Sequence, residues 1–321
     1  MIVTLTAHPS LDRTVALGGP LTRGAVLRVE GTSTQAAGKG VNISRAAVAA
    51  GIDTLAILPA AADDPSVHEL TEAGVRCSPV GPAGPIRVNL TLTEPDGTTT
   101  KLNATAEPAS AELLDQLSSM VLSAARTADW VVIAGSLPPA APPTWYADLV
   151  AALRRTPAKV AVDTSDDALA ALVASLGRAA PDLMKPNAEE LASFTGGDPH
   201  ELEASPAAAA AAARRLVSAG VEAVLATLGG AGAVLVTADG AWHATPPPTT
   251  VVSTVGAGDS SLFGYLLGAE RLLPPDQRLA LAVAYGSAAA ALPGTTIPTP
   301  SQVHPELVSL RVLDLTEGTV R

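Results

Sequence analysis

Short runs of β-branched and other apolar residues alternate along the chain with longer stretches in which apolar residues recur every three or four positions. The first pattern predicts strands and the second predicts helices. Strands are expected at residues 2–7, 54–58, 130–134, 159–163, 223–228 and 233–237, and helices at residues 41–50, 111–125, 144–155, 188–194, 206–219, 259–270 and 275–292. This alternation predicts βα units on a mostly parallel sheet, and so an α/β fold of the α/β/α sandwich type.

Two segments interrupt the alternation. Residues 11–35 contain no convincing helix, and residues 85–103 show alternating apolar side chains that lead into the turn Pro95-Asp96-Gly97, which is typical of a hairpin. We interpret residues 11–35 and 85–107 as a small separate sheet that forms a lid over the carboxyl ends of the main strands. An edge extension of the main sheet is the alternative that pattern leaves open. Because no long linker divides the chain, residues 1–321 are predicted to form a single domain.

Composition and charge exclude several classes of protein. The 321 residues carry 20 Lys and Arg against 31 Asp and Glu, a net charge of −11, and only 2% of them are aromatic, which argues against nucleic-acid binding. The longest apolar run is Ala207 to Ala213, far short of the roughly 20 residues that a membrane span needs. Cys77 is the only cysteine and the first residues lack a signal-peptide pattern, so a cytoplasmic location is expected.

A glycine turn before an apolar helix is the most informative motif in the chain. Gly256-Ala257-Gly258 is followed at once by Asp259 and then by an apolar stretch. Backbone N–H groups in such a turn can point at one anion. A carboxylate beside that anion can accept the proton of a hydroxyl that attacks phosphorus. The alternative is that Asp259 is only the N-cap of the helix.

A second glycine turn, Gly38-Lys39-Gly40, opens the helix that contains Asn42. It does not fit a phosphate-binding P-loop, because Gly follows Lys39 where Ser or Thr is required, and neither turn completes the dinucleotide fingerprint. An NAD-dependent oxidoreductase is therefore disfavoured. Lys39 and Asn42 remain candidates for binding a polar ligand at the start of the helix.

Two further motifs each allow a functional and a structural interpretation. Asn187 and Glu190 lie three residues apart at a helix start, where they can organise a hydrated Mg²⁺ or form a capping box, and the local sequence by itself favours the box. The segment from Thr227 through Gly229 to Gly232 follows a strand and can wrap a nucleotide or form a tight turn.

Taken together and in this order, these segments resemble the phosphofructokinase B family of ribokinase-like sugar kinases over nearly the whole chain. The matching motifs are residues 4–12, 38–42, 87–89, 101–103, 135–138, 185–190, 227–229 and 254–259, of which the last is the most specific to the family. Two departures stand out: His8 replaces the usual Asn before Pro9, and Pro139-Ala140 replaces the common Ser-Gly.

The resemblance implies a ribokinase-like three-layer α/β/α sandwich with a small β-sheet lid. It also implies an ATP-dependent kinase that uses Mg²⁺ and converts fructose 1-phosphate to fructose 1,6-bisphosphate, with fructose 6-phosphate or tagatose 6-phosphate as alternative acceptors. Members of this group often form homodimers through the lid. A protein of a different class, a non-catalytic regulator that binds a sugar phosphate, keeps the same fold.

The resemblance also assigns roles to individual residues. It implies that Asp259 is the catalytic base and that Gly256, Ala257 and Gly258 form the anion hole. The implied sugar-phosphate ligands are Asp12, Gly38, Lys39, Asn42, Arg87, Lys101, Asn103 and Ser136, with Arg87 taken to face the site. The implied nucleotide-binding residues are Lys185, Asn187, Thr227, Gly229, Gly232 and Thr254, and Asn187 and Glu190 are implied to hold Mg²⁺ through water.

Overall fold

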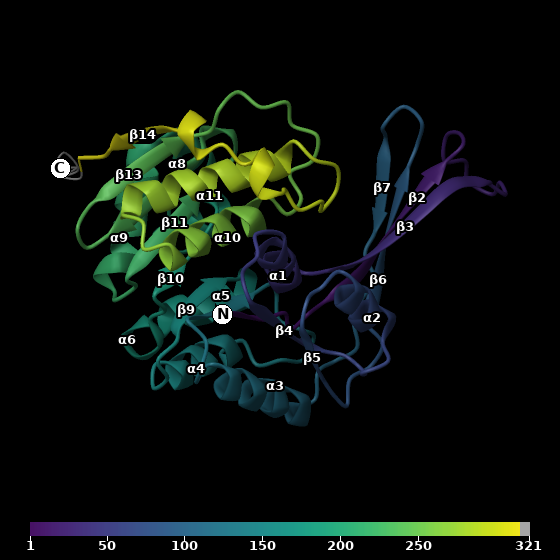
Figure 1. The fold of residues 1–321 in the computed structure, drawn as a ribbon, viewed down its shortest axis with the longest axis horizontal. Helices are drawn as coiled ribbons and strands as arrows, with labels where there is room; N and C mark the ends of the chain where they lie inside the picture. Colours follow the sequence, from purple (N-terminus) through teal and green to yellow (C-terminus); the bar gives the residue numbers. More distant parts are fainter. Residues whose placement is uncertain (315–321) are drawn as a thin grey trace.

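A large central sheet and a small second sheet organise the molecule, which the computed structural model describes over residues 1–314 (Figure 1). The order in the large sheet is β14 (Ser309–Val312), β13 (Ala241–Thr245), β12 (Ala233–Thr237), β11 (Ala223–Thr227), β10 (Leu183–Met184), β9 (Lys159–Asp163), β8 (Trp130–Ala134), β1 (Ile2–Leu5), β4 (Thr54–Pro59) and β5 (Cys77–Val80). Neighbouring strands from β5 to β11 are parallel, whereas β12, β13 and β14 add antiparallel to that sheet.

Helices cover both faces of this sheet because successive side chains of a strand point to opposite sides. In β8, Val131 and Ile133 enter one apolar core, while Trp130 and Val132 enter the other. The first core is closed by α3 (Ala111–Ala124), α4 (Trp145–Leu153), α5 (Asp166–Ala174), α7 (Ala188–Thr195) and α9 (Pro206–Ser218). The second is closed by α1 (Lys39–Ala49), α10 (Ala257–Glu270) and α11 (Pro275–Ala290). The predicted α/β/α sandwich is confirmed.

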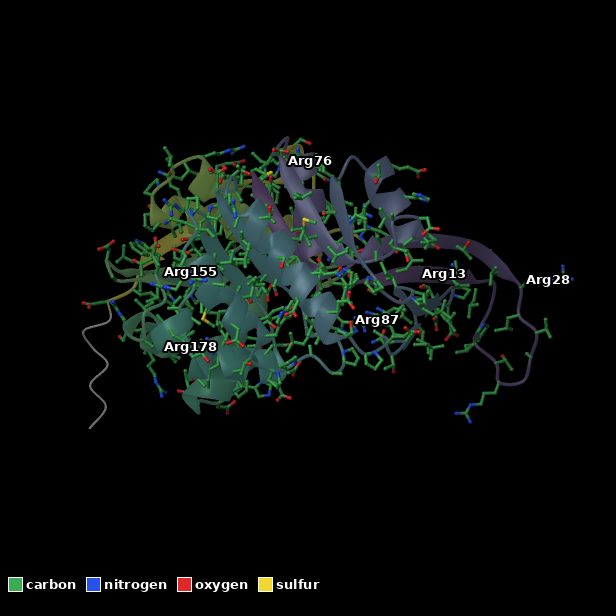
Figure 2. The ribbon with its side chains drawn as sticks, turned by 90° about the horizontal axis from the view of Figure 1, so that it is seen from below. Arg13, Arg28, Arg76, Arg87, Arg155 and Arg178 are labelled. Carbon is green, nitrogen blue, oxygen red and sulfur yellow. The ribbon has the colours of Figure 1, made fainter. Side chains whose placement is uncertain are left out.

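The two segments that broke the helical pattern form a second sheet. Its order is β3 (Val29–Ala37), β2 (Ser10–Leu17), β6 (Arg87–Thr93) and β7 (Thr99–Leu102), and none of these strands pairs with the large sheet. The separate sheet is thus confirmed, and the alternative of an edge extension is wrong. It projects from the body next to α1 and α2 (Pro65–Glu72) (Figure 1). Figure 2 shows Arg28 at its far end and Arg87 near the junction with the body.

Several elements, each of nine residues or fewer, were not predicted. These are β5, β10, β13, β14, α2, α5, α6 (Leu176–Ala179) and α8 (Pro199–Ala204). The helix predicted to begin at Asp259 begins at Ala257 instead. Among the described residues no helix is long and apolar enough to cross a membrane. Residues 315–321 of the predicted domain lie outside the described part of the chain.

Candidate active site

A cavity of about 950 Å³ opens at the carboxyl ends of the parallel strands. This edge is where open α/β sheets bind their ligands, and the volume suits a nucleotide-sized molecule. Asp163 at the end of β9, Lys185 after β10 and Thr227 at the end of β11 line one side of it, and the first turns of α1 and α10 line another. Ser10 and Asp12 of β2 bring the second sheet to the same cavity.

The turn that opens α10 presents unpaired backbone donors to the cavity. Gly256 has the left-handed φ of 79° and serves as the N-cap, so the N–H groups of Gly256, Gly258 and Asp259 make no hydrogen bond within the described part of the chain. Asp259 is the third residue of the helix and caps nothing, so the interpretation of Asp259 as an N-cap is wrong. Three free donors in one turn form a site for an anion.

The Asp259 carboxylate is buried beside this turn, where Asn42 of α1 donates a hydrogen bond from Nδ2 to Oδ2 over 2.7 Å. Burial, together with the negative charge of Asp163, raises the pKa of Asp259 to about 6. The hydrogen bond from Asn42 and the ammonium groups of Lys39 and Lys185 act in the opposite direction. The carboxylate is therefore ionised at neutral pH but binds a proton far more readily than an exposed aspartate.

Two lysines share one buried carboxylate at the same end of the cavity. Lys39 Nζ lies 2.7 Å from Asp163 Oδ1, and Lys185 Nζ lies 3.1 Å from Asp163 Oδ2. Burial by itself would raise the pKa of Asp163, but the two ammonium groups hold it below its usual value. Sequence reasoning missed Asp163, although a charged residue at the last position of a predicted parallel strand was an available signal.

The predicted glycine turn before α1 brings that helix against the first strand. A Cβ on Gly38 would lie 2.5 Å from Thr6 Cγ2, and one on Gly40 would lie 2.5 Å from Thr6 Oγ1. Only glycine permits this approach, which carries Lys39 and Asn42 into the cavity.

Asp12 lies on the face of the second sheet that borders the cavity. Its Oδ1 accepts hydrogen bonds from Ser10 Oγ at 2.9 Å and from Asn89 Nδ2 at 3.0 Å. Both donors fix the carboxylate in one orientation, with Oδ2 left for a ligand.

Asn187 and Glu190 form the capping box of α7. Asn187 Oδ1 accepts from the Glu190 N–H at 2.7 Å, and Glu190 Oε2 accepts from the Asn187 N–H at 2.9 Å. The structural interpretation of this pair is confirmed. It leaves Glu190 Oε1 without a hydrogen bond, and Asn187 lines the cavity.

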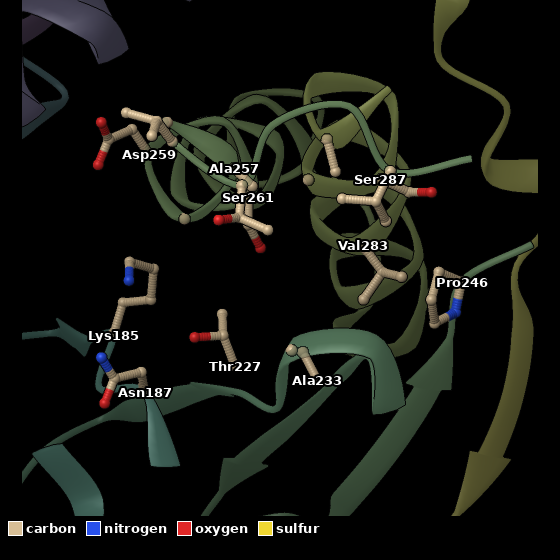
Figure 3. A pocket seen from close by; sticks show the side chains of 18 of the residues that line it. Lys185, Asn187, Thr227, Ala233, Pro246, Ala257, Asp259, Ser261, Val283 and Ser287 are labelled. Atoms are coloured by element: carbon tan, nitrogen blue, oxygen red, sulfur yellow. The ribbon is translucent and has the colours of Figure 1, made fainter. Parts of the chain in front are cut away.

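The opposite end of the cavity is apolar. Figure 3 shows Val283, Ala233 and Pro246 around that end, with Lys185 and Asp259 at the other. The predicted residues Thr227, Gly229, Gly232 and Thr254 also line the cavity, and Gly232 lies beside Pro246 at the apolar end. Sequence reasoning missed the proline-rich stretch 246–249 and the α11 residues Val283 and Ser287, because nothing local marks them as cavity residues.

Four predicted sugar-phosphate ligands lie outside the lining of this cavity. Arg87 borders a smaller adjacent hollow with His8, and Ser136 Oγ lies 3.1 Å from His8 Nδ1. Arg87 pairs with Ser10 and Asn89 with Asp12, so all four side chains share one face of the second sheet. Lys101 and Asn103 are exposed at and beyond the edge strand β7.

An anion-binding turn, a buried carboxylate and two ammonium groups around one cavity are the groups that phosphoryl transfer to a hydroxyl requires. These features define a phosphotransferase site on an α/β/α sandwich.

Comparison with known proteins identifies the family. The sequence profile described as pfkB family carbohydrate kinase matches residues 10–302, and the chain belongs to this family. It is 33% identical over 306 residues to a protein named 1-phosphofructokinase from Rhodobacter capsulatus, with 94% of each chain covered. The solved structure of phosphofructokinase-2 from Escherichia coli in complex with substrates and products superimposes with a TM-score of 0.84 at 28% identity, covering 95% of this chain and 99% of the other. The tetrameric inhibited form of that enzyme gives a TM-score of 0.81 at 28% identity, covering 92% and 95%.

Proposed function

We propose that this carbohydrate kinase transfers the γ-phosphoryl group of ATP to the 6-hydroxyl of fructose 1-phosphate, giving fructose 1,6-bisphosphate and ADP. The observation that carries the proposal is the Asp259 carboxylate, buried between the free N–H groups of its own turn and the ammonium groups of Lys39 and Lys185. The name of the Rhodobacter capsulatus relative supports fructose 1-phosphate as the acceptor.

In this mechanism Asp259 is the general base. The acceptor hydroxyl gives its proton to the Asp259 carboxylate while the hydroxyl oxygen attacks the γ-phosphorus and the bond from that phosphorus to the leaving oxygen of ADP breaks. The free N–H groups of Gly256, Gly258 and Asp259 and the ammonium group of Lys185 stabilise the charge on the transferred group. A pKa near 6 keeps Asp259 ionised at neutral pH while it still holds the proton once transferred.

The two ends of the cavity suit the two ends of ATP. The apolar end at Val283 and Pro246 accommodates a base, and Thr227, Gly229, Gly232 and Thr254 line the path from there to Lys185. Asn187 and Glu190 fit a hydrated Mg²⁺, since the free Glu190 Oε1 can accept from metal-bound water, and Mg²⁺ usually keeps several waters. The bound ion would neutralise phosphate charge.

The metal role predicts a specific effect of Glu190→Gln. The variant should need a higher Mg²⁺ concentration for half-maximal rate, because the carboxylate that orders metal-bound water is lost. Its free energy of unfolding should fall by no more than a helix cap contributes, about 0.5–2 kcal/mol, because Gln can also complete a capping box. Rates are measured across a Mg²⁺ titration, with the exposed Glu201→Gln as the charge-matched control. An unchanged Mg²⁺ dependence in Glu190→Gln would leave the pair a capping box and nothing more.

We propose that the phosphate that the acceptor already carries is bound by Arg87, Ser136 and His8. The hydroxyl groups of the acceptor are bound by Asp12 and Asn42. The protein has a net charge of −11, so an anionic sugar must be held by local donors rather than by long-range attraction. The shared face of Arg87 and Asp12 supports this arrangement. Lys101 joins them on that face through its pairing with Thr91, and Asn103 follows it.

Arg87→Ala should weaken the binding of fructose 1-phosphate by about 1.5–3 kcal/mol, which is the contribution of hydrogen bonds to charged groups. The KM for ATP should stay nearly unchanged. Arg155→Ala removes the same charge from the far side of the body and is the control (Figure 2). If Arg87→Ala impairs ATP and sugar phosphate equally, the acceptor's phosphate is bound elsewhere.

An ADP-release assay over a panel of acceptors tests the function itself. Fructose 1-phosphate should give the highest kcat/KM, ahead of fructose 6-phosphate and tagatose 6-phosphate, with free fructose a poor substrate. A higher value for either alternative phosphate would reassign the acceptor, and a better rate with a neutral sugar or nucleoside would overturn the sugar-phosphate proposal. Release of no ADP with any acceptor would favour a non-catalytic regulator.

We also propose that the second sheet is a lid and that two copies of the chain pair through it. The sheet face turned away from Asp12 carries Leu11, Val88, Leu90 and Leu102, of which Val88 and Leu102 are exposed. Burying such a face against a second copy would remove apolar surface from water. The homodimer, rather than the tetramer named for one form of the Escherichia coli enzyme, is the assembly that a single shared face supports.

A further inference from the structure

Asp163 joins three separate parts of the chain at the active site. Its side chain is fully buried at the end of β9, and each of its carboxylate oxygens meets one ammonium group. Lys39 comes from the first residue of α1, and Lys185 from the segment after β10. The chemistry proposed above assigns no role to Asp163.

We propose that Asp163 is a positioning residue that holds the ammonium groups of Lys39 and Lys185 toward the transferred phosphoryl group, and that its negative charge acts on the Asp259 carboxylate in the same cavity. The inference rests on the proposed function and deepens it. Asp163 itself acts through its neighbours.

Donor geometry supports the positioning role. An ammonium group has three N–H donors, so a lysine that spends one on Asp163 keeps two for a ligand. Lys185 Nζ lies against the anion-binding turn, because a Cβ built on Gly258 would be 3.3 Å from it. The Lys39 side chain is about one-third exposed and borders the same cavity. One carboxylate therefore orients two cations and leaves both able to bind phosphate oxygens.

Position and charge support the second role. Asp163, Lys39 and Lys185 line the same cavity as Asp259, and Lys185 lies against Gly258, the residue directly before Asp259. The charged groups that bear on Asp259 are Asp163 from β9, Lys39 from α1 and Lys185 from the segment after β10. Glu190 of α7 acts on Lys39, and Asp12 of β2 lines the same cavity. Asp163 raises the pKa of Asp259, while each lysine lowers it. Removing Asp163 or removing a lysine should therefore shift the titration of Asp259 in opposite directions.

Asp163→Asn is the direct test, because Asn keeps the shape but its NH₂ group cannot accept from the second lysine. At saturating substrates kcat should fall by about 10²-fold, the cost of misplacing catalytic groups by about 1 Å. The acid limb of the kcat profile should move about one pH unit lower, since a nearby negative charge is lost. A kcat within about threefold of wild type, or an unmoved acid limb, would overturn the proposal.

Lys39→Gln is the second variant, and the Gln NH₂ group can still donate to Asp163 Oδ1, so the buried carboxylate is not left without a donor on that side. Its acid limb should move about one pH unit higher, because a nearby positive charge is lost. Lys159→Gln is the matched control: this lysine pairs with Glu222 at the surface, and its loss should leave the profile unchanged. An acid limb that stays in place or moves lower in Lys39→Gln would overturn the charge role even if Asp163→Asn does not fold.

A ¹³C NMR titration of the Asp259 carboxyl group in the same variants measures these shifts without turnover. The resonance is assigned by its absence in Asp259→Asn. The two failures are thereby distinguishable, because an inactive wild type in the acceptor panel overturns the function, whereas parallel titrations in all variants overturn the role of Asp163.

Discussion

Replacing Asp259 with Asn should lower kcat by about 10²–10⁴, the usual contribution of a positioned acid-base group, with little change in sugar-phosphate affinity. Asn keeps the shape, and its Oδ1 can still accept from Asn42. What it cannot do is take the proton of the attacking hydroxyl. The measurement is kcat at saturation together with calorimetric binding of fructose 1-phosphate.

The thermal stability of Asp259→Asn distinguishes loss of the catalytic base from unfolding of the variant. Because burial raises the pKa of Asp259 from its ordinary value of 3.8 to about 6 in the folded protein, stability falls as the pH rises between these two values, and the cost of burying the anion is complete above about 6. Stability from this group is present at low pH, is lost as the pH rises through that value, and is restored by a neutral Asn. Asp259→Asn should therefore melt no lower than wild type at pH 8. Asp167→Asn, an exposed change in the first turn of α5, is the control. A variant that keeps more than about a tenth of wild-type kcat would exclude Asp259 as the base.

Gly264→Ala should destabilise the protein by about 1–3 kcal/mol, although Ala is the better helix former. Helices α10 and α11 cross so closely at Gly264 that an added Cβ would lie 2.6 Å from the Leu281 carbonyl oxygen and 2.8 Å from Ala282 Cα. Both contacts are with backbone, so one helix must shift. The free energy of unfolding is measured by urea denaturation.

The same substitution at Gly177 is a matched control with the opposite expected sign. Gly177 lies in the short helix α6, is exposed, and has nothing within 4 Å of an added Cβ. Gly177→Ala should stabilise the protein by about 0.4–1 kcal/mol, because Ala lowers the conformational entropy of the unfolded chain. Equal effects at the two positions would show that helix propensity, rather than packing against α11, decides the outcome at Gly264.

Local pattern predicted the long elements well for a physical reason. A strand such as β8 is apolar at every position because both of its faces are covered, and this leaves a continuous apolar run that needs no tertiary information. The strands β10 and β13 were missed because two residues, or a segment as mixed as Ala-Trp-His-Ala-Thr, carry no period of their own. Their strand geometry comes from pairing with neighbours.

The candidate site divides in the same way. The anion-binding turn can be recognised from the local sequence Gly256-Ala257-Gly258-Asp259, because a turn that points its N–H groups at an anion needs glycines. By itself the sequence thus determined the sandwich, the anion-binding turn and the family. Only the tertiary structure decided that Asp163 meets Lys39 and Lys185, and that Arg87 borders a separate hollow beside His8. Such contacts join residues as far apart as 124 positions, and no local period encodes them, because they arise from strand order and from the crossing of helices over the sheet.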